Sequence, residues 1–295
     1  MNKGVTAVLV SLLLIFIGLL TTVLVLVLNG KMKLNFNPIH IGSNYCNTLV
    51  EEKEFTSIKD LDLSGNSIDI KIEESDTNTI KIELYSDHAK KHLIEEEDNV
   101  IKAVLEEKNR GFAFNTKTPY IRVLIPSTYS NNIEADLKVG DIKIDSFPKT
   151  SINAIMSTGD FKAKSLKKAN VKSSTGDIKI ENIEDLEATL STGDIKVTSV
   201  ENIYARLNTG DIKITNIINY MNLSTKTGDI KVDKADINKN SKIESKIGDV
   251  KLRKVSGCYI EASTKVGDTD INNADRKSDI ILEIKSRVGD IKVNY

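Results

Sequence analysis

The sequence contains no tryptophan, and it has only two cysteines, four prolines and three histidines among its 295 residues. The two cysteines, Cys46 and Cys258, are too few and too far apart for a disulfide framework. Without tryptophan, and with eight scattered tyrosines, the chain lacks the aromatic surfaces on which sugar-cleaving enzymes hold their substrates. The 41 basic and 42 acidic residues nearly cancel, so the charge gives no reason to expect a nucleic-acid partner.

Charged residues are also missing from one long apolar segment, Val5–Leu28, which is 24 residues long. As a helix it would measure about 36 Å, more than the roughly 30 Å hydrocarbon core of a bilayer. It is too long for the apolar part of a signal peptide, and no Ala-x-Ala site follows it. We therefore expect an uncleaved membrane anchor within residues 1–30, a polar tether over 31–48 and an extracytoplasmic domain after it.

A Gly-Asp dipeptide recurs nine times between residues 140 and 290, at intervals of 17 to 22 residues. A short period of this kind is typical of stacked repeat proteins. In one copy Ile195 and Val197 flank Lys196, an alternation typical of a strand with one buried face. The glycine provides the freedom that a corner needs, and the aspartate can bond to neighbouring backbone. The nine corners are Gly140 and Asp141, Gly159 and Asp160, Gly176 and Asp177, Gly193 and Asp194, Gly210 and Asp211, Gly228 and Asp229, Gly248 and Asp249, Gly267 and Asp268, and Gly289 and Asp290.

A single short repeat cannot bury its own apolar face, whereas stacked repeats can. The sequence therefore predicts an all-β fold: a β-solenoid, similar to a parallel β-helix or β-roll, of about nine Gly-Asp coils over residues 131–295. Residues 49–130 also alternate, but without the glycine repeat, and we expect them to form an irregular, β-rich N-terminal cap that is continuous with the repeats. Within this cap, Ser64–Ile70 is a degenerate copy of the corner.

The corner aspartates are the most evident candidate site, because stacking would place their carboxylates about 4.8 Å apart. Calcium could neutralise them, but each corner has one glycine where calcium-binding β-rolls have three. The lysine two residues later, such as Lys196 after Asp194, lies on the same face and can neutralise the aspartate instead. We therefore expect a structural role for the corners, with no catalytic residue, cofactor or metal, and a calcium-binding β-roll as the alternative. His88 and His92 are too few for a closed metal site.

Two further expectations concern the side and the end of the solenoid. Five repeats have a threonine before the glycine, and alternation from the buried positions predicts that it faces the core: Thr158, Thr175, Thr192, Thr209 and Thr227. The last coil, Val288–Tyr295, finishes on a strand with no cap after it, and an uncovered strand edge invites pairing. The sequence therefore also allows self-association through the C-terminal coil. The eighth repeat departs from the pattern, with Thr269 and Asp270 in place of the apolar residue and the lysine.

An N-terminal apolar segment, a strand ending in Val123–Pro126 and Ser-Thr-Gly-Asp-Ile-Lys-Val repeats such as Ser191–Val197 are found together in this chain. In these features it resembles the bacterial putative-adhesin β-strand-repeat family, which includes membrane-anchored proteins of Lia-type envelope-stress operons. The resemblance covers about residues 49–295 and implies an envelope location without catalytic residues. We therefore expect a non-enzymatic, membrane-anchored scaffold or adhesin-like module, with an envelope protein or polysaccharide as partner. A self-assembling solenoid and a glycan-active enzyme are the alternatives.

Overall fold

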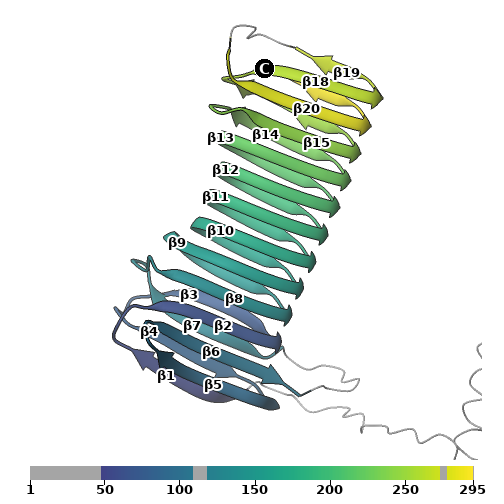
Figure 1. The fold of residues 1–295 in the computed structure, drawn as a ribbon. Coiled ribbons are helices and arrows are strands. Elements are labelled where there is room, and N and C mark those ends of the chain that lie inside the picture. Colours follow the sequence, from purple (N-terminus) through teal and green to yellow (C-terminus); the bar gives the residue numbers. More distant parts are fainter. Residues whose placement is uncertain (1–47, 109–117, 273–277, 295) are drawn as a thin grey trace, which may run out of the picture. The chain divides into compact units, whose positions relative to one another are not determined.

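The computed structural model describes residues 48–108, 118–272 and 278–294, and every regular element in these ranges is a β-strand. The strands wind into a stack of coils whose strands pair with those of the neighbouring coils (Figure 1). This confirms the predicted all-β solenoid. The predicted anchor, Val5–Leu28, and Cys46 lie outside the described residues. None of the described segments is a helix that could cross a membrane.

The described strands fall into three groups along the chain. The N-terminal group consists of β1 (Leu49–Phe55), β2 (Asp60–Ser67), β3 (Asp69–Ser75), β4 (Ile80–Tyr85), β5 (Ala89–Glu97), β6 (Val100–Glu107), β7 (Tyr120–Pro126) and β8 (Asn132–Val139). The central repeats form the long strands β9 (Ile142–Thr158), β10 (Phe161–Thr175), β11 (Ile178–Thr192), β12 (Ile195–Thr209) and β13 (Ile212–Thr227). The C-terminal repeats are divided into β14 (Ile230–Asp236), β15 (Ser241–Ile247), β16 (Val250–Leu252), β17 (Val255–Ser256), β18 (Tyr259–Val266), β19 (Thr269–Ile271), β20 (Ile281–Val288) and β21 (Ile291–Val293).

Neighbouring central coils are parallel and in register, so equal positions of successive repeats lie opposite one another. Ile178 of β11 pairs with Phe161 of β10 on one side and with Ile195 of β12 on the other. All three side chains are buried. Because the same register is kept at the other inward positions, the interior consists mainly of apolar columns that run from coil to coil, at the strand spacing of about 4.8 Å. One column is mixed, since it contains the buried residues Ser173, Thr225 and Ser245.

Each central coil bends while its ladder hydrogen bonds continue. In β11 the buried residues Ile178 and Ile180 are two apart, but Ile183 and Leu186 follow at steps of three. On a flat strand an odd step would turn the next side chain outward, so the chain must change direction to keep it in the core. The central coils are therefore continuous bent strands between one glycine corner and the next, 17 residues long in β9 and 15 in β10.

The N-terminal end of the stack is closed by antiparallel strands. β2 and β3 form the first coil and pair in parallel with β8 and β9. On their other side β2 pairs in parallel with β6, and β3 pairs in parallel with β7. The next strands are antiparallel: β5 pairs with β6, β4 pairs with β7, and β1 pairs with β4. Phe55 of β1 and Ile94 of β5 are still buried at this end.

The C-terminal coils do not stack in chain order. β20 of the last repeat pairs with β15 on one side and β18 on the other, and β21 lies likewise between β16 and β19. The coil of Gly289 is therefore inserted between the coils of Gly248 and Gly267 (Figure 1). The expectation that Val288–Tyr295 forms the uncovered end is wrong, because the edge strands are β18 and β19. Thr269 and Asp270 are both exposed there, and polar residues are least costly where the core ends.

Candidate functional site

The corner aspartates form one hydrogen-bonded column, which we call the Asp ladder. In each step a carboxylate Oδ1 accepts the backbone N–H of the aspartate in the next coil: Asp194 Oδ1 accepts from Asp211 at 3.0 Å, and Asp177 Oδ1 accepts from Asp194 at 2.8 Å. Nine such bonds of 2.8–3.0 Å join, in spatial order, Asp69, Asp141, Asp160, Asp177, Asp194, Asp211, Asp229, Asp249, Asp290 and Asp268. Each carboxylate therefore ties two coils together rather than closing a turn within its own coil.

The Asp ladder begins one coil before the glycine repeat. Ile68 takes the glycine position of the degenerate corner, since its N–H donates to Val139 C=O at 3.0 Å as the N–H of Gly140 donates to Thr158 C=O at 2.9 Å. Asp69 follows it and accepts from Asp141. Burial raises the pKa of Asp69 above its ordinary value, and the bond from Asp141 only partly offsets that effect.

Lysines pair with the Asp ladder along the same face of the coils. Ion pairs with N–O distances of 2.9–3.4 Å join Lys162 to Asp160, Lys196 to Asp194, Lys231 to Asp229 and Lys251 to Asp249. The N–H of Asp177 and then the ammonium of Lys162 lower the pKa of Asp160 below its ordinary 3.8. Because the pairs are exposed to solvent, each stabilises the fold by about 0–1 kcal/mol. At these four corners the ammonium groups also offset part of the repulsion between stacked carboxylates.

The glycine of each corner is required by its backbone angle and by the neighbouring coil. The nine glycines have φ between +131° and +143°, where residues with a side chain are strained. A Cβ on Gly193 would lie 2.0 Å from the carbonyl oxygen of Gly176 in the preceding coil. The missing side chain is therefore what allows consecutive corners to approach closely enough for the aspartate bond.

The threonines before the corners face solvent, so the expectation that they point into the core is wrong. Thr192 is exposed, and so is Ser191 beside it, whereas Leu190 is buried. The chain turns between Leu190 and Gly193, and alternation cannot be continued across a turn. Thr158, Thr175, Thr192, Thr209 and Thr227 thus form an exposed hydroxyl column next to the Asp ladder.

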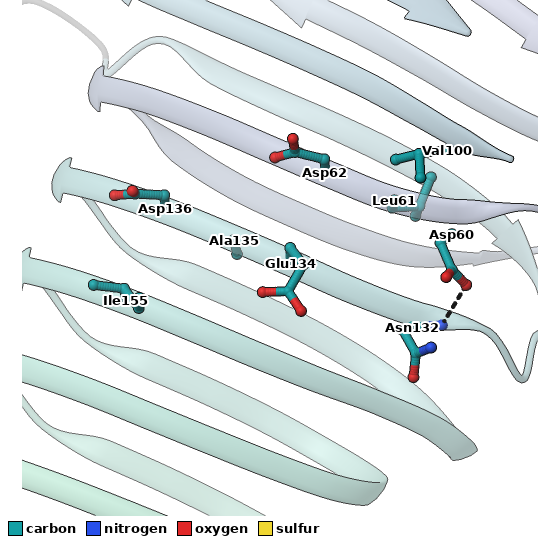
Figure 2. A pocket seen from close by; sticks show the side chains of 9 residues that line it. All are labelled: Asp60, Leu61, Asp62, Val100, Asn132, Glu134, Ala135, Asp136 and Ile155. Atoms are coloured by element: carbon teal, nitrogen blue, oxygen red, sulfur yellow. Dashed lines mark hydrogen bonds between the residues drawn. The ribbon is translucent and has the colours of Figure 1, made fainter. Parts of the chain in front are cut away.

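A hollow of about 460 Å³ lies on the outer side of β2, β6, β8 and β9 (Figure 2). Its lining includes four carboxylates, those of Asp60, Asp62, Glu134 and Asp136. Asp60 Oδ1 accepts the N–H of Asn132 at 3.0 Å, and Glu134 Oε2 accepts from Asn153 Nδ2 at 2.7 Å. The field of four carboxylates favours cationic groups over anions in this hollow. Sequence reasoning missed it, although the alternating acids of β2 and β8 were a visible signal.

A second polar cluster lies on β3, β4 and β7. Glu83 is buried there, with Lys81 Nζ at 2.8 Å, Tyr85 Oη at 3.0 Å and Arg122 Nη1 at 3.3 Å. Burial alone would raise the pKa of Glu83, but the bonds from Lys81 and Tyr85 outweigh it and lower the pKa. The Tyr85 ring stacks on Tyr120 at 4.6 Å between centroids. Because these groups satisfy one another, the cluster stabilises the N-terminal cap.

Metal ligands and nucleophiles are not gathered in the described part of the chain. Within it, no group of three His, Cys, Asp or Glu side chains is placed to hold a metal ion. His92 lies on strand β5, with its Nδ1 2.8 Å from Glu51, rather than on a helix. Cys258 is buried in the core.

Stacked parallel coils, glycine corners and a structural Asp ladder define the chain as a β-repeat protein of the solenoid class. A family model described as Toastrack DUF4097 matches residues 58–184 and again residues 181–295. The chain belongs to this family, which confirms the family expected from the repeats.

Several solved structures are similar to the chain. A putative adhesin from Parabacteroides merdae ATCC 43184 is 11% identical, with 83% of this chain and 95% of that chain covered and a TM-score of 0.45. A putative adhesin from Bacteroides fragilis NCTC 9343 is 16% identical, with 83% and 96% covered and a TM-score of 0.40. A putative cell adhesion protein from Clostridium sporogenes ATCC 15579 is 15% identical, with 83% and 98% covered and a TM-score of 0.28. No curated protein matches the chain.

Proposed function

We propose that this protein is a single-pass, membrane-anchored scaffold or adhesin-like interaction module, and that its repeat domain lies on the outer side of a bacterial cell membrane. The uncharged segment Val5–Leu28 supports the anchor, because its length matches the hydrocarbon core of a bilayer.

The Asp ladder is the observation that carries the non-enzymatic part of the proposal. The corner carboxylates are the most regularly repeated acidic groups of the solenoid, and each of those from Asp69 to Asp290 accepts a backbone N–H of the next coil. A catalytic acid or base needs surroundings that differ from those of its neighbours. From Asp141 to Asp290 the corner aspartates repeat one backbone hydrogen-bonding pattern, which suits a rigid support better than an active site.

Protease treatment of intact cells tests the location. We expect externally added protease to digest the repeat domain of the full chain while a cytoplasmic marker protein stays intact. Lysed cells provide the control that the domain can be cut. If the domain is protected until lysis, the outer location is wrong. Extraction with alkaline carbonate tests the anchor separately, since an integral membrane protein stays in the pellet.

A pull-down from solubilised membranes, with the anchored chain as bait, tests the scaffold role. We expect an envelope protein or a cell-wall polysaccharide to be retained by the full chain. Retention of the same component by beads that carry an unrelated anchored protein would count against a specific interaction. Turnover of a glycan by the purified chain would overturn the non-enzymatic assignment.

A further inference from the structure

The end of the solenoid that is formed by β18 and β19 leaves core positions open. Ala262, Thr264 and Ile271 occupy positions that are buried in the adjacent coil, where Ile284 and Val293 are 0% exposed. In the terminal coil Ala262, Thr264 and Ile271 are only half-buried. Val266, at the end of β18, is 61% exposed, but it precedes a corner glycine, a position that also faces solvent in the non-terminal coils, where Ile247 and Val288 are 54% and 41% exposed. Here the apolar columns end without a cover from any described strand.

The two ends of the stack differ in this respect. At the N-terminal end, antiparallel strands bury Phe55 and Ile94, and the outermost strand β5 carries the exposed charges of Lys90, Lys91 and His92. Charged side chains on an edge strand oppose pairing with another strand. β18 has only Glu261 and Lys265 as charged residues, and they have opposite signs.

The backbone of β18 also offers hydrogen-bonding groups at its open edge. Tyr259 N–H donates to Ile280 C=O, on the side of β20. In a parallel pair alternate residues point to opposite sides, so Ile260, Ala262 and Thr264 direct their N–H and C=O groups away from β20. An extended strand could add there by ordinary ladder bonds.

We propose that the occupant of this edge is β18 of a second copy of the chain, paired antiparallel about a two-fold axis through Ser263. Dimers with two-fold symmetry use the same patch on both subunits. In this register Glu261 lies opposite Lys265 of the second copy, and this pair occurs twice. Opposite charges in cross-strand positions stabilise a sheet.

The same register covers the apolar positions. Ala262 lies opposite Thr264 of the second copy, and this pair occurs twice, so the half-buried inward positions of the two edges meet at the interface. A shift by one residue would place charged side chains opposite the core positions. A shift of the axis to Ala262 would place Lys265 opposite Tyr259 and lose both charge pairs. The charge order of β18 therefore selects one register.

Charge reversal on the full-length, detergent-solubilised chain tests this interface by sedimentation equilibrium. We expect E261K and K265E each to weaken dimerisation by about tenfold or more, because two attractive pairs become repulsive. The double variant E261K/K265E restores both pairs and should dimerise like the natural chain. A mixture of the two single variants should form a mixed dimer, since its charges are again opposite. E187K changes the equivalent position of the internal strand β11 and should have no effect.

Cross-linking gives an independent readout. In a C46S background, S263C places a thiol beside its symmetry mate, and we expect mild oxidation to give a covalent dimer. T189C, at the equivalent position of β11, should stay uncross-linked. The proposal is overturned by a chain that is monomeric at the highest concentration reached. It is also overturned if both single variants dimerise as strongly as the natural chain. A double variant that folds normally by circular dichroism but does not regain dimerisation would overturn it as well.

Discussion

Replacing a corner glycine by alanine should open the stack locally, and Gly193→Ala is the most informative case. At φ +132° alanine is strained by about 1–3 kcal/mol. Its Cβ would also lie 2.0 Å from Gly176 O, so the two corners must separate. Two bonds would then be lost or lengthened, from Gly176 N to Thr192 O at 3.1 Å and from Asp194 N to Asp177 Oδ1 at 2.8 Å. With about 1 kcal/mol for each bond, the expected loss of stability is about 3–5 kcal/mol.

Urea unfolding followed by circular dichroism measures this loss, and amide hydrogen exchange shows where it falls. We expect faster exchange in β10, β11 and β12 than in β2 or β8, because coils contact mainly their neighbours. Ser191→Ala, an exposed change two residues away, serves as the control and should stay within about 0.5 kcal/mol. A Gly193→Ala protein as stable as this control would refute the argument that close contact between corners requires glycine.

Four further predictions concern the groups that join the coils. Asp194→Ala should destabilise the protein by about 1–2 kcal/mol in urea unfolding, and Asp194→Asn by less, because asparagine keeps an acceptor for the Asp211 N–H; equal losses would exclude the bond as the cause. The pKa values of Asp160, Asp194 and Asp249 are lowered in the folded protein, so their ionised forms stabilise the fold above the ordinary pKa of 3.8, and this stability is lost as the pH falls through the lowered values. In an acid titration, Asp194→Asn should therefore lose less folding free energy than the natural chain. Burial raises the pKa of Asp69, so its charge opposes folding at neutral pH, and Asp69→Asn should be neutral or stabilising at pH 7 by thermal melting, in contrast to Asp194→Asn. Removal of divalent cations with a chelator should leave the circular dichroism and the melting temperature unchanged, whereas unfolding would revive the calcium-binding β-roll.

The repeat could be predicted from sequence because the same two residues, a glycine and an aspartate, form the corner of each coil. Each Gly-Asp pair couples a backbone that requires φ > 0 to an acceptor that reaches the next coil, so a two-residue signal fixes both the bend and the register. The degenerate corner shows the limit of this constraint. Ile68 replaces glycine in the first coil, and the clash that excludes a Cβ at Gly193 comes from the preceding corner. Ile68 has no preceding Gly-Asp corner to approach.

Two features could not be read from the pattern. The inward placement of Thr192 was wrong because period-two alternation holds only within a strand, and the chain bends after Leu190. The order of the last coils was wrong because it was taken from the order of the chain, although the corners at Gly267 and Gly289 are alike and either could be outermost. The polar residues Thr269 and Asp270 contained that information. The acidic hollow was missed since its carboxylates come from strands that are adjacent only after stacking.

The order of the last coils also bears on how such a solenoid ends. Stacked coils present nearly the same side surface at every level, so the two ends carry the surfaces that do not repeat. One end is closed within the chain by antiparallel strands and edge charges. At the other end the chain inserts its last, regular coil beneath the irregular coil of Gly267 and so places its poorest apolar columns outermost. This arrangement lowers the cost of an open end, because the exposed Thr269 replaces an apolar residue there, whereas its partner one coil inward, Ile291, is buried. It also leaves β18 as an open edge strand with one acidic and one basic residue, Glu261 and Lys265, which can pair with Lys265 and Glu261 of a second copy.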